Sequence, residues 1–587
     1  MSQREPFEWI EIDVDYCDLT YGEGDCTASL GATGVRKCFN MFRHCQDQEN
    51  FTKGVKTLKY CKPASNLPVN AGFYPVLQSV RMSTATVNIG GIDKDLSALG
   101  RRGTMEARLL DFADHGRGLD KYQAERISGA AQTDEGGYDP VGRGSHFTKL
   151  MAQFPYYSGR PARQCSGYIE DGAVITVETR HFVMTNISTD RSGRYTIESK
   201  DILDLADNKK AVAPAATSGV VLDPITAESG VVTMQPEGIG DLEYPASGVA
   251  SIGSELVEFT RIADVLTLTQ RGAKGTQASS HDTDDAVQLA YSVFKQRLDV
   301  TIRELLVDYA GIDEAFIPFD EWQAEVTRWA GTLLLSVTIP KPEGVAGLVG
   351  ELATLGVSIW WDDVSQKIRL KMVRPIDGDT LFELSDDSGI KQVSRDDMED
   401  DRITEVGFYS VTVNPMDSYK RPENYKRQFF PVDILSKSPN AHGDTRKLDV
   451  FMRWLDHGND RLAKIVSRRI LKRRRTSPVR YTMLLDDKDG AIGLTDVLSV
   501  TTRAYTDETG KKVPALMQVL SREKVRNGHE FRVVAQSYVY EGRFGYAMPA
   551  GSPSYGDATE EQRATGCFAV DAATLKFPDN TNPYEAI

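Results

Sequence analysis

Long hydrophobic runs are missing from this chain, whose longest uninterrupted apolar pieces are a few residues long, as at residues 333–335. A transmembrane helix needs about 20 consecutive apolar residues, so none is expected. The N-terminal segment MSQREPFEWIEIDV has no apolar core of a signal peptide, and we therefore expect synthesis in a reducing cytosol. A surplus of basic residues is also missing. The net charge of −15 argues against stable nucleic-acid binding over a broad surface.

The residue patterns of common enzymes are absent as well. There is no H-E-x-x-H segment and no nucleophile motif. Gly142 and Gly144 lack the third glycine of a dinucleotide-binding turn. Asp111, Asp114 and His115 could supply a base or ligate a metal, but no second cluster accompanies them, and a hydrogen-bonded structural corner is the preferred interpretation. We therefore predict that the chain is not an enzyme and has no catalytic residues.

Cysteine is sparse but concentrated, since five of the seven cysteines form the pattern Cys17-x8-Cys26-x11-Cys38-x6-Cys45-x15-Cys61. Zinc ribbons and fingers usually present C-x2-4-C pairs, and no pair here is closer than C-x6-C. Disulfides require an oxidising compartment. Wide, uneven spacing suits the larger 4Fe-4S cluster, whose irons can be reached by loops from several directions. The cluster is the leading interpretation, with zinc, disulfides and inert buried thiols as open alternatives.

The segments CDLTYGEGDC and RKCFNMFRHCQDQENFTKG resemble the cysteine domain of the lambda-type minor tail protein L family and of the related hub proteins of gene transfer agents. In these families, two cysteines separated by eight residues precede two separated by six. An Asn-Phe-x-x-Gly turn follows, matched here by Asn50, Phe51 and Gly54. The resemblance implies that four thiolates bind an iron-sulfur cluster, namely Cys17, Cys26, Cys38 and Cys45. Cys61 is the odd cysteine and could substitute for any of them.

Short segments rich in Thr, Val, Ile and Tyr, separated by turns, predict a multidomain α+β chain that is predominantly β. Residues 7–17 alternate apolar and acidic side chains, as a half-buried strand does. Helical spacing predicts helices at 293–310, after Asp320, through VAGLVGELATLG and at 458–475. The predicted divisions are a metal-stapled cysteine module at 1–65, a β domain at 66–214, an inserted small β subdomain at 215–290, an α+β domain at 291–400, a β domain at 401–547 and an extended tail at 548–587.

Several charged groups are interpreted as structural. Asp13 and Asp15 are predicted to form the solvated face of the first strand, and His281 and Asp284 to be polar groups of a loop. The acidic run at 396–401 reads as a solvated loop. The basic run at 472–476 suits a helix C-terminus, where the helix dipole favours cations. Its functional alternative is contact with an acidic neighbour or the lining of a channel for DNA.

A second resemblance is broader. The segments LGRRGTMEARLLDFADH, YDPVGRGSHFTKLMAQFPYYSGRP and IESKDILDLADNKKA are similar to the central tail hub, or baseplate hub, proteins of siphophages and gene transfer agents. This resemblance implies β-barrel-like domains assembled as a homotrimer in the tail tip of a virion, after assembly in the host cytoplasm. It also implies contacts with tail-tube, tape measure and receptor-binding proteins, and transient passage of DNA during ejection. Two alternatives are a metal-dependent tail-associated hydrolase and a zinc-stapled tail-tip adhesin.

Overall fold

The computed structural model describes residues 4–20, 23–27, 40–68, 71–91, 93, 96–97, 99–113, 145–330, 333–374, 376, 379–441, 443–456, 460–526, 530–537, 544–547, 567–570 and 585–586. The chain forms two compact units. Unit 1 is Met1–Ala85, Arg102–Ile202 and Trp361–Gln366, and unit 2 is Thr86–Arg101, Leu203–Trp360 and Lys367–Ile587. Strands predominate and several sheets are barrel-like, which confirms the predicted fold class. Within the described residues, no helix is long and apolar enough to cross a membrane.

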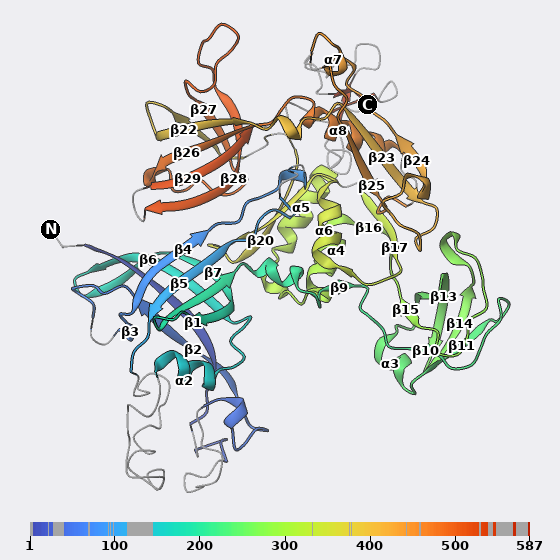
Figure 1. Ribbon diagram of the computed structural model, residues 1–587, viewed down its shortest axis with the longest axis horizontal. Coiled ribbons are helices and arrows are strands. Elements are labelled where there is room, and N and C mark those ends of the chain that lie inside the picture. The colour runs from blue at the N-terminus through green and yellow to red at the C-terminus, as the bar shows by residue number, and fades with distance from the viewer. Residues whose placement is uncertain are drawn as a thin grey trace. The chain divides into compact units, whose positions relative to one another are not determined.

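Unit 1 is built on one eight-stranded sheet (Figure 1). In spatial order its strands are β3 (Phe73–Tyr74), β2 (Lys53–Cys61), β1 (Glu5–Cys17), β6 (Pro161–Glu170), β7 (Ala173–Thr189), β8 (Arg194–Lys200), β5 (Thr104–Leu110) and β4 (Leu77–Ser83). The alternation in β1 buries Ile10, Ile12 and Val14 in the core of this unit. Helix α2 (His146–Gln153) adds Phe147 and Leu150 to the same core.

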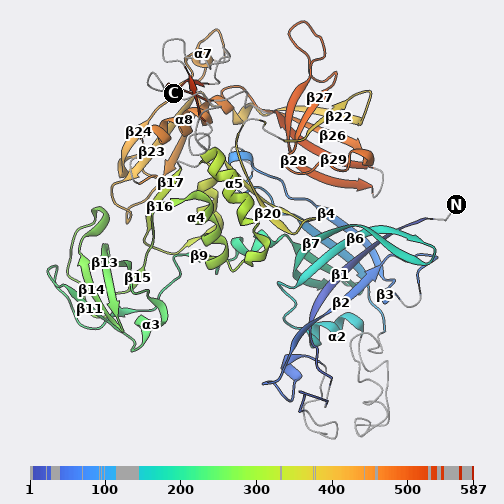
Figure 2. The same ribbon diagram turned by 180° about the vertical axis from the view of Figure 1, so that it is seen from behind.

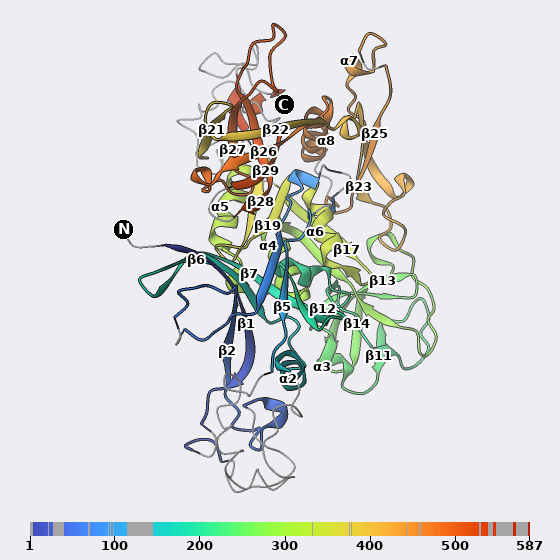
Figure 3. The same cartoon turned by 60° about the vertical axis from the view of Figure 1, so that its left-hand side comes forward.

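The cysteine-rich segment is a long connection inside this sheet. β1 pairs with β2 on one side, from Trp9 opposite Cys61 to Cys17 opposite Lys53, and with β6 on the other side. Figure 3 shows β1 and β2 running side by side. The structure therefore differs from the predicted boundary at residue 65. The strands on either side of the cysteines, β1 and β2, belong to the larger β domain. Backbone N–H and C=O groups need hydrogen-bond partners, and those of these two strands find them in neighbouring strands of the sheet.

Asp111 forms a corner that starts helix α2. Its Oδ1 accepts hydrogen bonds from the backbone N–H groups of Phe112 (3.0 Å) and Phe147 (3.3 Å). A carboxylate near the first turn of a helix satisfies amides that have no partner within the helix. The other two members of the predicted trio, Asp114 and His115, lie outside the described residues.

Asp13 is not on a solvated face, contrary to the prediction for β1. Its side chain is buried, and its two carboxylate oxygens accept hydrogen bonds from Arg163 Nη1 (2.7 Å) and Nη2 (2.6 Å). Thr57 Oγ1 donates a third at 2.7 Å. β1 lies between β2 and β6, and residues of both neighbours cover Asp13. Burial works against the charge of Arg163, but the bonds to Asp13 and Glu11 raise the pKa of its guanidinium.

Replacing Arg163 with methionine should destabilise unit 1 by about 3 kcal/mol, because the buried Asp13 carboxylate would lose its counter-ion. Hydrogen exchange of β1 amides in the full chain would measure the loss. The control is Lys53→Met, since Lys53 is exposed and its Nζ lies 3.8 Å from Asp15. Such a pair contributes about 0–1 kcal/mol. Equal losses in the two variants would contradict the role assigned to Arg163.

Within unit 2, residues 219–290 fold into a small β-barrel (Figure 2). Its strands, in spatial order, are β10 (Val220–Val221), β11 (Val231–Gln235), β14 (Val265–Gln270), β13 (Glu255–Ile262), β12 (Ser247–Ile252) and β15 (Val287–Leu289). Val220 bridges to Ala286, and the N–H of Val287 donates to the carbonyl of Gly219 at 2.9 Å. The first and last strands are therefore neighbours, and the sheet closes on itself.

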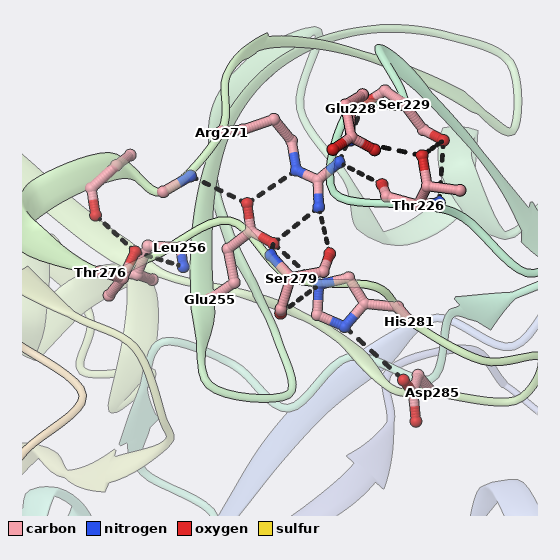
Figure 4. A network of polar contacts seen from close by, with 12 residues as sticks. Thr226, Glu228, Ser229, Glu255, Leu256, Arg271, Thr276, Ser279, His281 and Asp285 are labelled. Carbon is pink, nitrogen blue, oxygen red and sulfur yellow. Dashed lines mark hydrogen bonds and ion pairs between the residues drawn. The ribbon is translucent and has the colours of Figure 1, made fainter.

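A buried ionic network joins the loops of this barrel (Figure 4). The Glu255 carboxylate is 0% exposed and accepts hydrogen bonds from Arg271 Nε (2.7 Å), Arg271 Nη2 (2.8 Å) and the backbone N–H groups of Gly272 (2.8 Å) and Ser279 (3.0 Å). His281 Nε2 lies 2.9 Å from Glu255 Oε2. The prediction of His281 as a loop polar group is therefore wrong. Its partner comes from a strand 26 residues earlier in the chain.

The predicted helices of unit 2 are present as α5 (Phe319–Ala330), α6 (Val345–Ala353) and α8 (Asp460–Arg474). The segment predicted as one helix at 293–310 begins as strand β16 (Tyr291–Arg297), continues as α4 (Leu298–Glu304) and ends in a π-helical turn, Leu305–Tyr309. β19 (Val357–Asp362) and β20 (Lys367–Met372) form a two-stranded sheet.

Unit 2 also contains a six-stranded and a three-stranded sheet. One contains β21 (Leu381–Ser385), β27 (Val497–Thr501), β28 (Ala515–Arg526), β29 (Glu530–Ser537), β26 (Val479–Asp486) and β22 (Ile390–Asp397), in that order. The other contains β24 (Tyr425–Phe429), β23 (Glu405–Thr412) and β25 (Lys447–Met452). The structure differs from the predicted boundary at residue 400, because β21 and β22 belong to the sheet of the later strands.

The predicted acidic loop and basic helix end meet at one buried contact. Arg474, at the end of α8, is 2% exposed and donates from Nε to the carbonyl of Asp401 at 2.9 Å. Its Nη2 lies 3.4 Å from Asp401 Oδ1, and Asp401 is also buried. Asp401 is therefore not solvated, and Arg474 is an internal ion-pair partner, not a cation lining a channel.

Candidate metal centre

The candidate centre begins where β1 ends. Cys17 is the last residue of β1, and its backbone N–H donates to the carbonyl of Asn40 at 2.9 Å. The N–H of Asp18 donates to the carbonyl of Thr52 at 3.1 Å. These two bonds hold Asn40 and Thr52 against the end of β1.

Two further cysteines sit on tight turns of this segment. The N–H of Cys26 donates to the carbonyl of Glu23 (3.1 Å), and the N–H of Cys45 donates to that of Phe42 (3.1 Å). The Cys45 thiol also donates to the carbonyl of Asp47 at 3.0 Å. Cys17 and Cys45 are buried and Cys26 is half-buried. The fourth predicted ligand, Cys38, lies outside the described residues.

The Cys45 thiol is influenced by its burial and by the other two described cysteines. Burial raises the pKa of the Cys45 thiol, and the neighbouring groups of Cys17 and Cys26 raise it further. In the described part of the chain, no three Cys, His, Asp or Glu side chains are grouped closely enough to bind a single metal ion. Thiolates are the donors that iron-sulfur clusters and zinc require. The type of donor therefore matches the predicted group, whereas the described side chains do not gather three donors around one point.

Asp47 joins the turns that follow Cys26 and Cys45, and sequence reasoning missed it. Its Oδ2 accepts hydrogen bonds from Thr27 N (2.8 Å), Thr27 Oγ1 (2.9 Å) and Asn50 Nδ2 (3.1 Å). The bond from the backbone of Thr27, followed by that from Asn50, lowers the pKa of Asp47. Asn50 belongs to the Asn-Phe-x-x-Gly turn, which was the only signal in the sequence that could have indicated this connection.

The other two residues of that turn also make specific contacts. The Phe51 ring packs edge-on against Phe42, with 5.3 Å between the ring centroids. A side chain at position 54 would collide with Asp18, since a Cβ added to Gly54 would lie 1.9 Å from Asp18 Oδ1. Each matched residue of the turn therefore has a structural reason at its position.

Cys61 lies far from Cys17 along the sheet. It lies opposite Trp9 in β2, whereas Cys17 lies opposite Lys53, so eight residues of strand separate the two cysteines along the sheet. At about 3.3 Å per residue this is about 26 Å. Cys61 is fully buried beside Phe7, Trp9 and Cys165, and burial raises its pKa to about 11. This geometry does not support the predicted substitution of Cys61 for another ligand.

Replacing Asp47 with alanine should speed the hydrogen exchange of the Thr27 amide about fivefold, because that N–H loses its acceptor. The control is Asp190→Ala, since Asp190 accepts similar turn bonds from Ser192 N (2.8 Å) and Arg194 N (3.1 Å) elsewhere in unit 1. The control should leave Thr27 unchanged. Unaltered exchange at Thr27 in Asp47→Ala would contradict the connection described.

No protein-family model and no curated protein matches the sequence. Among solved structures, a tail protein from Neisseria meningitidis MC58 matches with a TM-score of 0.33 and 10% identity, over 78% of this chain and 99% of that one. The prophage tail protein gp18 from Listeria monocytogenes EGD-e matches with a TM-score of 0.32 and 10% identity, over 77% and 87%. A Francisella PdpA-VgrG complex matches with a TM-score of 0.35 and 9% identity, over 94% and 61%. At these values the likeness carries no argument about function.

Proposed function

We propose that this chain is a structural, non-enzymatic subunit of a phage tail, and more specifically the central hub at the tip of a long non-contractile tail. In this role it acts as a homotrimer in the virion. It joins the tail tube and the tape measure protein to the receptor-binding proteins, and it opens for DNA to leave.

The observation that carries the proposal is a contact between two of the sequence segments similar to tail hubs. Gly103, in LGRRGTMEARLLDFADH, donates its N–H to Asp201 Oδ2 at 2.7 Å. Asp201, in IESKDILDLADNKKA, returns its own N–H to the carbonyl of Gly103 at 3.0 Å. Strand β5 of the first segment pairs along its whole length with β8, whose residues 197–200 belong to the second segment. Residues that carry the resemblance are thus mutual partners, as expected if the resemblance reflects a shared fold.

The third of these segments contains α2, which packs on the same core. Phe147 of α2 stacks on Tyr195 of β8, with ring centroids 4.9 Å apart, and both are buried with Leu109 of β5. Three stretches separated in sequence thus build one part of unit 1. This supports reading the likeness as one domain and not as isolated motifs.

We further propose that Cys17, Cys26, Cys38 and Cys45 hold a 4Fe-4S cluster, with zinc as the alternative. Bound there, such a group would supply covalent anchors for a segment that has little apolar surface of its own. Two features of the chain support this proposal: β1 ends at Cys17, and the Asp47 bonds join the turns after Cys26 and Cys45. The role proposed for the group is mechanical.

Immunogold labelling of purified particles that carry an epitope-tagged copy of the full chain tests the hub role. We expect label at the tail end distal to the head, and particles lacking the gene should have no completed tails. A tagged capsid protein is the control for label position. Label on the head, or no incorporation into particles, would contradict the proposal.

A further inference from the structure

One outer face of the small barrel at residues 219–290 is aliphatic. In the ladders, Val220 lies opposite Gln235, Thr233 opposite Val265, and Val265 opposite Ile262. The N–H of Leu222 donates to the carbonyl of Thr233 at 2.8 Å. Side chains at directly opposed positions share a face of the sheet. Thr233, Val265 and Ile262 therefore form one row across β11, β14 and β13, and Leu222, the residue after β10, extends it beside Thr233.

A second row lies beside the first and carries no charge either. Val231 is opposite Thr267, and Thr267 is opposite Thr260. Successive outward positions along a strand are two residues apart, so the two rows are adjacent on the same face. Every residue of both rows is described. Ile262 is 84% exposed, Val231 48%, Leu222 39% and Val265 37%. Four aliphatic side chains thus share an uncharged, solvent-facing surface, which we name the Val/Thr face.

The rest of the barrel is strongly acidic. Residues 215–290 contain eleven Asp and Glu and three Lys and Arg, for a formal charge of −8, which is more than half of the −15 of the whole chain. All three cations are paired within the barrel. Arg261 Nη1 lies 2.6 Å from Asp241 Oδ1. Arg271 Nε lies 2.7 Å from Glu255 Oε1, and Lys274 Nζ lies 2.7 Å from Glu258 Oε1. The field around the Val/Thr face is therefore negative.

We infer that the Val/Thr face is a docking surface for a protein partner that presents an apolar patch rimmed by Lys and Arg. An exposed apolar surface depleted of charge is typical of the centre of a protein interface. The acidic surroundings attract a cationic partner and steer its approach. Two copies of this face would bring two barrels of charge −8 together, which opposes self-association through it. The same charge disfavours nucleic acid.

Site-specific photo-crosslinking of the full chain tests this inference. The experiment uses cells that produce the chain together with the products of the genes that neighbour its own gene. The photoreactive residue p-benzoylphenylalanine replaces Thr267, at the centre of the face, or Ser254, which is exposed in the turn between β12 and β13. Mass spectrometry identifies the crosslinked peptide and its protein. We expect one protein partner at position 267, through a region in which Lys and Arg outnumber Asp and Glu, and no such product at position 254.

Two matched variants separate the face from the overall charge. Ile262→Lys should lower the crosslinking yield at position 267 at least about tenfold, since it places a charge within the apolar face. Gln277→Lys adds the same charge at an exposed position off the face and should change the yield less than about twofold. The inference is overturned by crosslinks to a second copy of this chain, to an acidic protein or to a carbohydrate, by no product at position 267, or by equal effects of the two variants. If the chain proves absent from tails while the cationic partner is found, the proposed function fails and this inference stands.

Discussion

Replacing Cys17, Cys26 or Cys45 with serine is expected to reduce the iron retained by the anaerobically purified full chain at least about tenfold, because a cluster that loses one of its thiolates is no longer held. Cys17 is the last residue of β1, and Cys26 and Cys45 lie on turns that follow it. Cys17 and Cys45 are buried. Cys38→Ser should behave in the same way. Iron and acid-labile sulfide, measured per chain, report the result.

The controls are Cys61→Ser and Cys165→Ser. Both thiols are buried in the same unit, but they lie in a separate cluster with Phe7, Trp9 and Ile169. Their replacement should leave the iron content unchanged, even if the sheet loses some stability. Iron retained after replacing Cys17, Cys26 or Cys45 would contradict the proposed ligand set, and iron lost equally in the two controls would point to unfolding instead.

Replacing Glu255 with glutamine is expected to destabilise the small barrel by about 3–5 kcal/mol, because the partner Arg271 would keep its charge without a counter-ion. Arg271 Nη1 also donates to the carbonyls of Thr226 (2.8 Å) and Ser229 (2.9 Å), so the loops that it ties together should loosen with it. Hydrogen exchange of β13 and β14 amides in the full chain measures this local stability. The control is Glu258→Gln, since the Glu258 pair with Lys274 is partly exposed. It should cost less than about 1 kcal/mol.

The same carboxyl group predicts a pH dependence. Burial raises the pKa of Glu255, but the bonds from Arg271, Ser279, Gly272 and His281 outweigh it and lower the pKa to about 2, from an ordinary value of 4.5. A carboxyl whose pKa is lower in the folded state stabilises the fold above its ordinary pKa and loses that contribution as the pH falls. Exchange of the barrel amides, corrected for intrinsic rates, should therefore rise as the pH is lowered from about 4.5 toward 2, and should not in Glu255→Gln.

Local periodicity predicted much of the fold. The alternation in residues 7–17 identified β1, and the helical spacing of Trp322 and Val326 identified α5. These signals succeed because each depends on which face of one element is buried. The Asn-Phe-x-x-Gly turn likewise indicated residues with specific contacts, since Asn50 bonds to Asp47 and Phe51 packs on Phe42. The ligand set predicted from the two cysteine spacings stays a prediction, and Cys38 lies outside the described residues.

The features that could not be predicted from the sequence depend on contacts between residues far apart in the chain. Asp13 looks solvent-facing in the pattern of β1, and only pairing with β6 places Arg163 beside it. The local sequence around His281 is typical of a polar loop, and only the folding of the barrel places His281 beside Glu255. The membership of β1 and β2 in the eight-stranded sheet could not be predicted for the same reason, since their neighbour β6 lies about a hundred residues later in the chain.

Metal and sulfide analysis of the anaerobically purified full chain, together with its visible absorption spectrum, tests the central claim most directly. The account predicts a brown protein with about four iron atoms and about four sulfide ions per chain. A colourless protein with stoichiometric zinc, or one without metal, would contradict it.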